Sequence, residues 1–528
     1  MIVLSFCALQ AAANPIDLYG IGARSTAMAG AYAALADDYS AAFYNPAGLY
    51  QIRGKHAATL GYMRSFSNLG LRFTPAPGSS SFVRKDLRDL EHELSNPEPA
   101  EAWVGGLTMN FFDRSFFGCA IHVPTKWLNR NRSYEATVPR FFLWQNRAQV
   151  LKPFFGFSIK IIDGLAVGAG FALYEDVAGN VKLPLVFDNS NFTDDPSNLE
   201  GGLAPHIDVN LSQPIDLQAT GGIHWAPSRF FRTGLSYRGV YALEARLTIE
   251  ADIQLKNLAI DMALLRDLFP YTLNVVIDIP GLGATEVPVR LMDLSGELIV
   301  DAHIPVNVEM IFSELWTPQE LTWGVASDPI DALTLSFDLT WYDWSAMVPP
   351  GTAFVIDEIR INGRLLPSVI QVLADVSVPV VGAVSLPLEI SVPETPLEIS
   401  VPIAASTLVK PVMRDVWVPR IGAEYRLPRM RPWGKDLDVA LRGGYAYLQS
   451  PLDAQRGVTN LYDNDRHLIC GGFGIKALQS VSLDASVQWH KLVEREHNKV
   501  LVDPYHGFTK VKAAGDVTAI NVTLTVRF

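Results

Sequence analysis

The chain has 528 residues, of which 49% are hydrophobic and 19% are charged, and its net charge is −12. The basic residues are dispersed and form no block, which argues against nucleic acid as a partner. No uncharged run reaches the ~20 residues that a membrane helix needs, so a bundle of membrane helices is not expected. A membrane β-barrel remains open, because each of its strands needs only ~9–11 residues.

The first thirteen residues have the pattern of a signal peptide. Met1–Ala13 has an apolar centre and ends in three alanines, a small-residue cleavage pattern. We expect export and cleavage after Ala13, and a buried N-terminal strand is the alternative. Cys7 lies in this segment, which leaves Cys119 and Cys470 in the mature chain. Their spacing fits no metal site, so we expect two packed or lumenal thiols.

Residues 14–52, which we call the N-terminal segment, differ from the rest of the chain. They are rich in glycine and alanine and end in the sequence Asn45–Leu49, NPAGL. Residues 53–528 read instead as a long series of strands. We predict that the N-terminal segment is a small hatch, or plug, inside a barrel formed by the remainder. A plain amphipathic helix of a soluble domain is the alternative.

Strands are predicted from side chains that alternate between apolar and polar. The clearest runs are Val481–Leu492 and Ile520–Phe528. Fourteen strands are predicted, an even number as in bacterial barrels. Their ranges are 55–66, 101–112, 115–125, 143–162, 165–187, 201–226, 230–255, 297–326, 333–347, 411–428, 436–449, 466–477, 480–494 and 512–527.

The two faces of these strands favour a transmembrane barrel over a soluble sandwich. The polar faces carry glycine, serine, threonine and isolated charges, as expected of a lumen. The apolar faces carry tryptophan and tyrosine toward the strand ends, as in the aromatic girdles of outer-membrane barrels. We therefore predict an all-β, fourteen-stranded antiparallel barrel in the bacterial outer membrane. A soluble exported β-protein is the alternative.

The connections between successive strands are predicted to alternate in length. Those at one end of the barrel are short, and those at the outer end are long. The long outer insertions are residues 67–100, 256–297 and 349–410. Within the first, Asp86–Leu94 predicts a short helix, and within the second, Leu258–Leu265 has helical spacing. The third contains the heptapeptide PLEISVP twice. Because proline cannot donate to a ladder, the repeat predicts an edge ribbon or an extended arm, unless it is a duplication without a role.

Several motifs resemble the FadL/TodX family of outer-membrane transporters. The N-terminal match covers Gly20–Leu49 and includes the NPA tripeptide, the family's most recognisable hatch motif. Weaker matches follow in the expected order up to residue 475. They are Trp341–Ser345, Val418–Tyr425, Arg442–Tyr447 with Ser450-Pro451, and Asp465-Arg466 with Gly471–Gly474.

This resemblance implies a barrel closed by an N-terminal hatch, which carries fatty acids or aromatic hydrocarbons across the outer membrane. The ligand would land among the outer loops, enter a lumenal pocket and leave sideways where the third strand kinks. In that strand Gly118 and Pro124 are the lateral-opening candidates, because both weaken pairing; an ordinary strand end at Pro124 is the alternative. The insertions at 256–297 and 349–410 depart from the family pattern, which leaves the substrate open.

The hatch would be the moving part. Pro46 fixes one turn and biases Asn45 toward an extended backbone, and glycines such as Gly48 permit unusual angles. Asp37 and Asp38 are predicted to cap a turn or to pair with lumenal arginines. The gating residues are therefore predicted to be Asp37, Asp38, Asn45, Pro46, Ala47 and Gly48.

Three lumenal arginines could receive a carboxylate head group. Arg420, Arg426 and Arg442 lie on predicted inner faces of neighbouring strands. The alternative is a network of salt bridges to Glu424, Asp438 or the aspartates of the N-terminal segment. No catalytic set, metal spacing or phosphate loop is present, so neither an enzyme nor a cofactor is expected.

Two functions remain in competition. The first is passive uptake of a hydrophobic small molecule, with outer-membrane lipid as the surrounding partner. The second is a role in protein secretion, in which the long apolar loops dock a protein.

Overall fold

The computed structural model describes residues 15–528 apart from internal gaps; the longest gaps are 131–138, 185–205, 262–271, 403–411 and 429–436, and the others have up to four residues. One antiparallel sheet closes on itself, because β1 pairs with β2 on one side and with β31 on the other. The predicted fourteen-stranded barrel is thereby confirmed. Its strands are β1 (Ala57–Pro75), β2 (Glu101–Phe112), β3 (Ser115–Pro124), β7 (Lys152–Ile162), β8 (Leu165–Tyr174), β11 (Asp216–Ser228), β12 (Phe231–Arg238), β18 (Glu320–Ile330), β19 (Leu333–Tyr342), β25 (Val416–Arg426), β26 (Leu437–Leu448), β28 (Arg466–Ala477), β29 (Val481–Leu492) and β31 (Phe508–Arg527).

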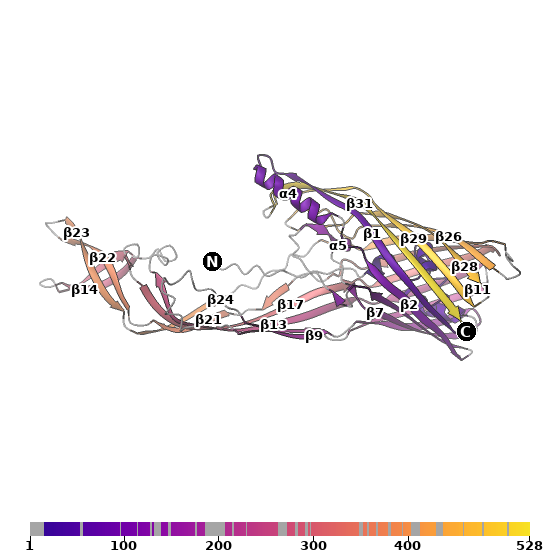
Figure 1. Ribbon diagram of the computed structural model, residues 1–528, viewed down its shortest axis with the longest axis horizontal. Coiled ribbons are helices and arrows are strands. Elements are labelled where there is room, and N and C mark those ends of the chain that lie inside the picture. Colours follow the sequence, from indigo (N-terminus) through magenta and orange to yellow (C-terminus); the bar gives the residue numbers. More distant parts are fainter. Residues whose placement is uncertain are drawn as a thin grey trace.

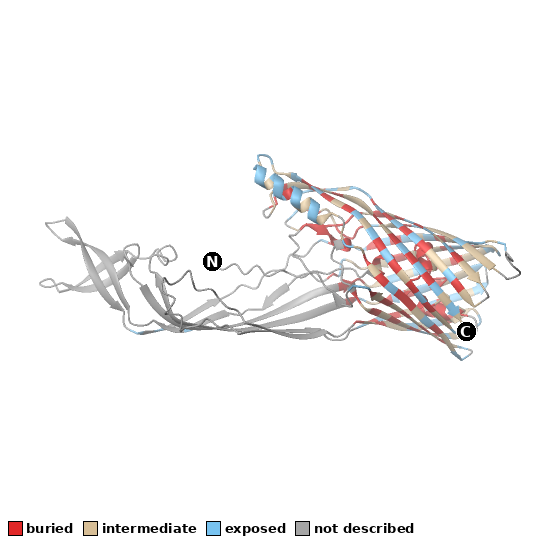
Figure 2. Cartoon of the chain, in the orientation of Figure 1, coloured by how far each residue is buried: buried red, intermediate tan, exposed pale blue. Residues whose placement is uncertain are grey.

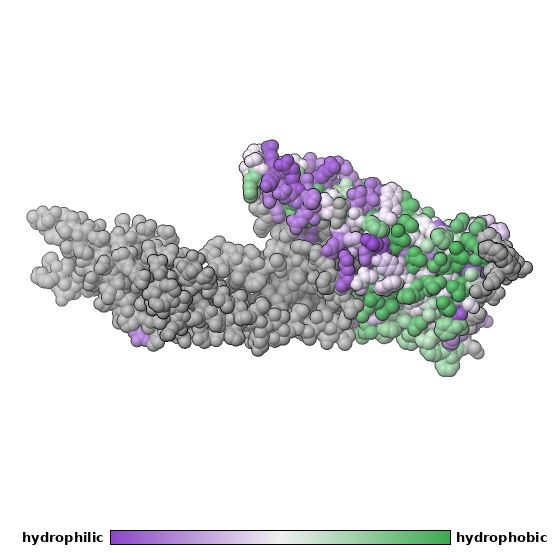
Figure 3. All heavy atoms as spheres, viewed as in Figure 1, coloured by the Kyte–Doolittle hydropathy of each residue, from purple (hydrophilic) through white to green (hydrophobic). Residues whose placement is uncertain are grey.

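The barrel is polar inside and apolar outside. On β29 the side chains of Ser486, Gln488 and His490 are buried, whereas Val487 and Trp489 are exposed. The same alternation is visible on the side of the wall that faces the viewer in Figure 2. Hydrophobic residues accordingly dominate the barrel surface, while hydrophilic ones gather toward the end that carries α4 (Ser81–Leu94) (Figure 3). Among the helices that the structure describes, none is both long and apolar enough to cross a bilayer.

Exposed tryptophans lie near the ends of the wall strands. Trp103 and Trp417 occur at the start of β2 and β25, and Trp225 and Trp489 near the end of β11 and β29; each is at least 40% exposed. This is the arrangement that the sequence predicted from the apolar faces. Tryptophan suits such positions because its ring is apolar and its N–H is polar.

Short connections occur at one end of the barrel, where the chain also ends (Figure 1). The strands leave only 163–164, 229–230 and 331–332 between three of the hairpin pairs. At the opposite end β1 and β31 extend beyond the wall, and α4 packs against them. This helix confirms the one predicted at Asp86–Leu94 but begins at Ser81, because the Ser80 side chain accepts a hydrogen bond from Val83 N–H.

A second sheet projects from that opposite end, and we call it the arm (Figure 1). Its strand order is β24-β21-β17-β13-β10-β9, with β20 also paired to β17. The bounds are β9 (Val177–Pro184), β10 (His206–Gln213), β13 (Tyr241–Asp261), β17 (Glu297–Thr317), β20 (Thr352–Val355), β21 (Glu358–Leu365) and β24 (Thr395–Pro402).

The helical spacing read at Leu258–Leu265 is wrong where the structure describes it. Residues 258–261 continue β13 and pair with Leu298–Val300 and Glu297 of β17. Pairing with a distant strand has overridden a local pattern, as it often does for short apolar runs. Residues 262–265 lie outside the described residues.

Both copies of the PLEISVP repeat lie in edge strands, as predicted. The first copy, up to Val392, is in β23 (Gly382–Val392), at one edge of the sheet β16-β22-β23, and its last residue, Pro393, lies outside the described residues. The second is in β24, at one edge of the arm. Proline is tolerated there because an edge strand has one unpaired side. The remaining short strands are β4 (Asn129–Arg130), β5 (Arg140–Phe141), β6 (Gln149–Val150), β14 (Thr272–Ile279), β15 (Gly283–Arg290), β16 (Leu294–Ser295), β22 (Ser368–Val378), β27 (Leu461–Tyr462) and β30 (Arg495–Asn498).

Cys119 and Cys470 are free thiols in the structure, the first half-buried on β3 and the second buried on β28. They are packed, as predicted. Residues 1–14, which include the predicted signal peptide, lie outside the described residues.

Candidate ligand cavity and the N-terminal segment

The N-terminal segment lies inside the barrel and is folded into short helices. They are α1 (Pro15–Tyr19), α2 (Ala23–Ala27), α3 (Ala41–Tyr44) and the 3-10 helix η1 (Pro46–Gln51). Its backbone and side chains bond to inward-facing residues of the wall. Thr26 Oγ1 is 2.7 Å from Ser486 Oγ on β29, and Tyr32 N–H and Ala33 N–H each donate to Asp338 of β19 at 2.8 Å.

The NPA motif forms a compact base for this segment. Asn45 is extended before Pro46, and its Oδ1 accepts from Ala47 N–H at 3.1 Å, which caps η1. Its Nδ2 donates to Ala33 O at 2.8 Å, so the side chain ties two turns together. Gly48 approaches Ala36 so closely that an added Cβ would lie 2.2 Å from Ala36 O.

Glycines of the wall make room for this base. A Cβ at Gly222 of β11 would lie 2.0 Å from Asn45 Oδ1, and one at Gly168 of β8 would lie 2.3 Å from Ala47 N. Ser158 of β7 donates to Ala47 O at 2.9 Å. The glycine-rich strands therefore fit the backbone of the N-terminal segment, and Asn45 and Ala47 are fully buried.

The two predicted aspartates have different roles in the structure. Asp38 accepts from Ser40 N–H at 2.9 Å and so caps a turn, one of the two roles expected. Asp37 pairs with Arg24 of the same segment rather than with an arginine of the wall. Burial, and then the charge of Asp37, raise the pKa of the Asp38 carboxyl. Their part in gating stays a prediction.

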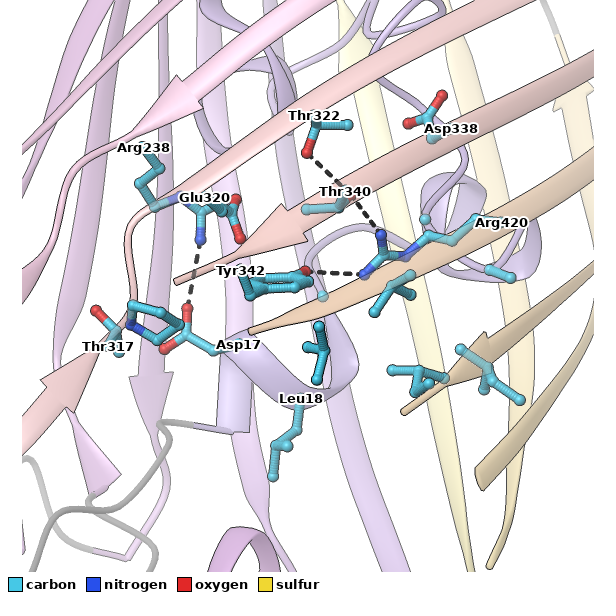
Figure 4. Close-up of a pocket in the computed structure, with 18 of the residues that line it drawn as sticks. Asp17, Leu18, Arg238, Thr317, Glu320, Thr322, Asp338, Thr340, Tyr342 and Arg420 are labelled. Atoms are coloured by element: carbon cyan, nitrogen blue, oxygen red, sulfur yellow. Dashed lines mark hydrogen bonds and ion pairs between the residues drawn. The ribbon is translucent and has the colours of Figure 1, made fainter. Parts of the chain in front are cut away.

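A cavity lies between the N-terminal segment and the arm end of the barrel. The space open to the centre of a water molecule is about 140 Å³. Apolar walls come from α1, α3, the wall strands and the connections beyond them, which include the short helix α5 (Phe142–Gln145). The residues are Leu18, Phe43, Leu143, Trp344, Val416, Val418, Leu448 and Leu468. Charged groups also line it, and Figure 4 shows Arg238, Glu320, Asp17 and Arg420 around the same space.

One charged cluster joins α1 to the wall. Asp17 Oδ2 lies 3.5 Å from Lys152 Nζ of β7, and Asp17 Oδ1 lies 3.4 Å from Arg238 Nη1 of β12. Arg238 also pairs with Glu320 of β18 at 3.1 Å and stacks over the Phe43 ring. The sequence prediction missed this cluster, although the alternation on β12 would have placed Arg238 on the inner face.

The three predicted arginines divide between two environments. Arg442 lies between Glu424 at 2.8 Å and Asp484 at 2.7 Å, and Arg426 pairs with Glu424 at 3.0 Å near the short-connection end. Arg442 and Arg426 therefore take part in salt bridges, which was the alternative interpretation of the sequence. Arg420 alone of the three lines the cavity, where it donates to Thr340 Oγ1 at 2.6 Å and to Tyr342 Oη at 2.9 Å.

Arg466 of β28 is a further cavity-lining cation that the sequence prediction did not select. Its side chain is 6% exposed, and Asp463 Oδ1 lies 3.9 Å from its Nη1. Neither Nε nor Nη1 has a hydrogen-bond partner within the described part of the chain. Its guanidinium lies 5.3 Å from the centre of the Trp144 ring. The alternation along β28 places Arg466 on the inner face, and this pattern could have identified it from the sequence.

The third strand is paired without a break. β3 pairs with β2 from Ser115 to Pro124 and with β7 from Ser115 to His122. Gly118 faces inward, where an added Cβ would lie 2.5 Å from Leu49 of η1. An opening at Gly118 would therefore need local unpairing, whereas the pairing with β7 already stops at His122, before Pro124. Lateral opening at either residue stays a prediction.

No family model matches the sequence. The crystal structure of a FadL homologue from Pseudomonas aeruginosa is similar over 96% of this chain and 98% of that chain, with a TM-score of 0.51 and 16% identity. The fold is similar to that of a FadL homologue. The resemblance read from the motifs is thus confirmed at the level of the fold. The P. putida toluene transporter TodX is similar over 97% of this FadL-like chain and 99% of its own, with a TM-score of 0.47 and 14% identity.

A curated relative is similar over a shorter stretch. Alkane uptake protein A of Marinobacter nauticus is 33% identical over 123 residues, which are 22% of this FadL-like chain and 25% of that protein. The match therefore spans a quarter of the relative's length. Among the residues that the structure describes, no group of histidine, cysteine, aspartate and glutamate could hold a metal ion.

Proposed function

We propose that this protein is an outer-membrane channel for passive uptake of hydrophobic small molecules and not an enzyme. One observation carries the proposal: a closed barrel with an apolar exterior holds, inside, a cavity that combines apolar walls with arginine side chains. The apolar exterior suits the lipid of a bilayer. A similar protein that is named for alkane uptake adds support.

The cavity favours a ligand with a long apolar chain and an acidic head group. Arg238 already has two carboxylate partners, Asp17 and Glu320. Among the residues that the structure describes, the hydrogen-bond partners of Arg420 are the neutral Thr340 and Tyr342, and Arg466 has a carboxylate, that of Asp463, at 3.9 Å. A charge-assisted hydrogen bond from a guanidinium to a carboxylate is stronger than a neutral one. Long-chain fatty acids therefore fit the cavity better than aromatic hydrocarbons.

Release requires a change of shape. Burial of an alkyl chain is favourable by about 0.8 kcal/mol per CH₂, so a ligand that is well buried does not leave a static cavity quickly. The N-terminal segment closes the lumen below the cavity through Asp37, Asp38 and the Asn45–Gly48 base. Its displacement, followed by lateral release near Gly118 and Pro124, completes the proposed route to the outer-membrane lipid or the periplasm.

Uptake of three radiolabelled ligands tests the proposal. Palmitate, hexadecane and toluene are supplied to cells that lack their own uptake channel and produce this protein. We expect Arg466→Leu to lower palmitate uptake about tenfold and leave hexadecane uptake unchanged, because only palmitate carries a carboxylate. Arg426→Leu, which removes an arginine outside the cavity, is the matched control. Uptake of none of the three ligands above background would contradict the channel; equal loss of palmitate and hexadecane would contradict the head-group site.

The arm supports a second candidate, a protein-binding role in secretion. It carries a large sheet beyond the barrel, as a docking element would (Figure 1). To test this role, the intact protein is purified from its own outer membrane, and palmitate uptake is measured in the deletion strain. A partner retained in a stoichiometric complex, together with normal palmitate uptake, would favour the secretion role.

A further inference from the structure

A polar groove lies at the outer end of the barrel, between α4 and the extensions of β1 and β31 beyond the wall. The space in it that is open to the centre of a water molecule is about 640 Å³. Gly70 of β1 and Ala514 of β31, which pair with each other, form its floor. A Cβ added at Gly70 would meet no atom within 4 Å, so the space above the floor is open. Charged side chains of α4, β1, β29 and β31 form its sides.

Strand register places the groove directly beyond the apolar surface of the wall. Phe66 of β1 and Trp489 of β29 pair with the same residue of β31, and both side chains are at least 40% exposed. Two residues farther along the strands, ~7 Å away, the next outward row is Asn68, Asp516 and Lys491, which all line the groove. Tryptophan marks the boundary between hydrocarbon and head groups. The groove therefore lies at the height of the lipid head groups, where Figure 3 shows the surface change from hydrophobic to hydrophilic.

Helix α4 turns polar side chains toward the groove. Arg88, Glu91 and His92 line it, and their spacing of three and four residues places them on one side of the helix. Leu87, on another side, is buried in the apolar cluster of the barrel end. Glu91 Oε1 accepts a hydrogen bond from Phe73 N–H of β1 at 2.7 Å, where the edge of β1 is no longer paired with β2. This bond holds α4 beside the strand, and so keeps one side of the groove in place.

The carboxylates of the groove already have partners. Besides Glu91, which bonds to the backbone, Glu494 pairs with Lys512 at 2.7 Å. Asp516 Oδ2 accepts a hydrogen bond from Trp489 Nε1 at 3.4 Å, which joins the groove to the aromatic row beside it. The other cations of the groove are not needed for any of these contacts.

Three of those cations have no carboxylate partner. Within the described part of the chain, Arg72, Arg88 and Lys491 form no ion pair. Arg72 also lies directly opposite Lys512 in the ladder of β1 and β31, and like charges at opposite positions repel. An anion between α4 and the two strands would relieve this repulsion and would receive hydrogen bonds from guanidinium groups. The groove therefore suits an anion that comes from outside the chain.

We propose that this groove binds the phosphate group of a lipid in the outer leaflet of the outer membrane. The inference rests on the proposed outer-membrane location, and it assigns a site outside the barrel lumen that ligand uptake does not use. Guanidinium groups bind phosphate through paired hydrogen bonds, and basic pockets at a membrane surface bind lipid head groups. The exposed Phe66 and Trp489 side chains lie next to the groove, where the acyl chains of the same lipid would contact them. This apolar neighbourhood favours a lipid over free inorganic phosphate.

Native mass spectrometry of the full-length protein tests the site, and lipid A with two phosphate groups is the probe. We expect the double variant Arg72→Gln/Arg88→Gln to weaken lipid A binding about thirtyfold, because each substitution removes one cation at head-group height. The matched control, Arg84→Gln/Lys85→Gln, removes the same charge from exposed positions of α4 outside the groove. Its binding should change less than about threefold. Equal weakening in the two variants would reduce the effect to net charge and overturn the site.

A second pair of variants tests the shape of the groove without a change of charge. Gly70→Phe fills the open space above the floor and should weaken lipid A binding about tenfold. Gly471→Phe, on the exposed surface of β28, also meets no atom within 4 Å of its new Cβ and should leave binding unchanged. Undiminished binding to Gly70→Phe would place the lipid elsewhere and overturn the groove as its site. The heat-dependent shift in gel mobility checks the barrel fold of each variant.

Two further measurements separate the outcomes. An excess of inorganic phosphate should not displace lipid A; displacement would make the groove a site for a free anion and overturn the lipid. Palmitate uptake should be the same in Arg72→Gln/Arg88→Gln and in the unsubstituted protein, since both residues lie outside the lumenal cavity. Loss of lipid A binding with normal uptake supports the site, whereas loss of both would assign the two arginines to ligand uptake instead. Absence of uptake in both proteins contradicts the channel alone.

Discussion

The two ends of the N-terminal segment meet the barrel in opposite ways. At its base, Asn45–Gly48 fit against wall glycines with neutral hydrogen bonds and almost no free space. At the cavity end, Asp17 of α1 reaches Lys152 and Arg238 through ion pairs of 3.4–3.5 Å beside an open space. The base depends on shape and the cavity end depends on charge.

This difference indicates which end a ligand can move. A close fit of backbone against backbone loses its contacts outright when it shifts by a fraction of an ångström. Ion pairs at longer distance can exchange partners, for example with a ligand carboxylate. We therefore expect the cavity end to respond first and the base to hold until the segment is displaced as a whole.

Overpacking the base should have the largest effect. Gly222→Val places a side chain where Asn45 Oδ1 lies, 2.0 Å from the position of the new Cβ. We expect a loss of about 3 kcal/mol or more in docking of the N-terminal segment, because the Asn45 side chain is held in place by its bonds to Ala33 O and Ala47 N–H. Protease cleavage within residues 15–52 and single-channel conductance measure undocking. Gly221→Val is the matched control, because the atom nearest to its new Cβ would be Gly168 O at 3.9 Å. Equal cleavage in the two variants would contradict the close fit.

Removing the ionic contact at the other end should have the next largest effect. Asp17→Ala takes away the carboxylate that Lys152 and Arg238 share. A buried ion pair that loses one partner typically costs 3–5 kcal/mol, and we expect about 3 kcal/mol because Arg238 keeps Glu320. Hydrogen exchange of the α1 amides measures the loss. Faster exchange at Ala47 and Gly48 as well would show that the two ends are not independent.

Loss of the cap at the base should have a smaller effect than either. Asn45→Ala removes the bond to Ala33 O and the cap on Ala47 N–H. We expect a decrease of about 2 kcal/mol in stability of the docked segment, with barrel assembly intact. Gln51→Ala, which loses only a 3.5 Å bond to Ala36 O, is the control. If palmitate uptake is identical in the two variants, the NPA motif takes no part in gating.

The smallest effect should be a pH dependence confined to the cavity end. Burial raises the pKa of the Asp463 carboxyl, in the connection before β28, to about 6. A raised pKa of an acid means that the folded state favours its protonated form. The contribution of the protonated Asp463 carboxyl to the stability of the folded state is therefore fully present below about pH 4, and it is lost as the pH rises through about 6. Hydrogen exchange of residues 460–465 at pH 4.5 and pH 7 measures it.

In the Asp463→Asn variant this pH dependence should disappear. The amides of Asn45–Gly48, which carry no titratable side chain, should show no such dependence in either protein. A pH response at the base that follows the one at residues 460–465 would contradict the separation of the two ends.

The sequence alone determined the number of wall strands and the base of the N-terminal segment, although the predicted strands 201–226, 230–255 and 297–326 each joined a wall strand to an arm strand. Period-two alternation is a local consequence of the pleat, so β29 and β31 could be read directly from Val481–Leu492 and Ile520–Phe528. The NPA motif likewise acts within a few residues, through the Asn45 cap and the fixed turn at Pro46. Both signals are short in range and need no knowledge of distant residues.

Only the tertiary structure decided which charges meet and which distant segments pair. Asp17 contacts Arg238 across 221 positions, and Arg420 was separated from Arg426 and Arg442 by its place along the lumen. Pairing with β17 made residues 258–261 a strand rather than a helix. These outcomes depend on barrel closure and strand register, which are set by contacts between residues far apart in the chain.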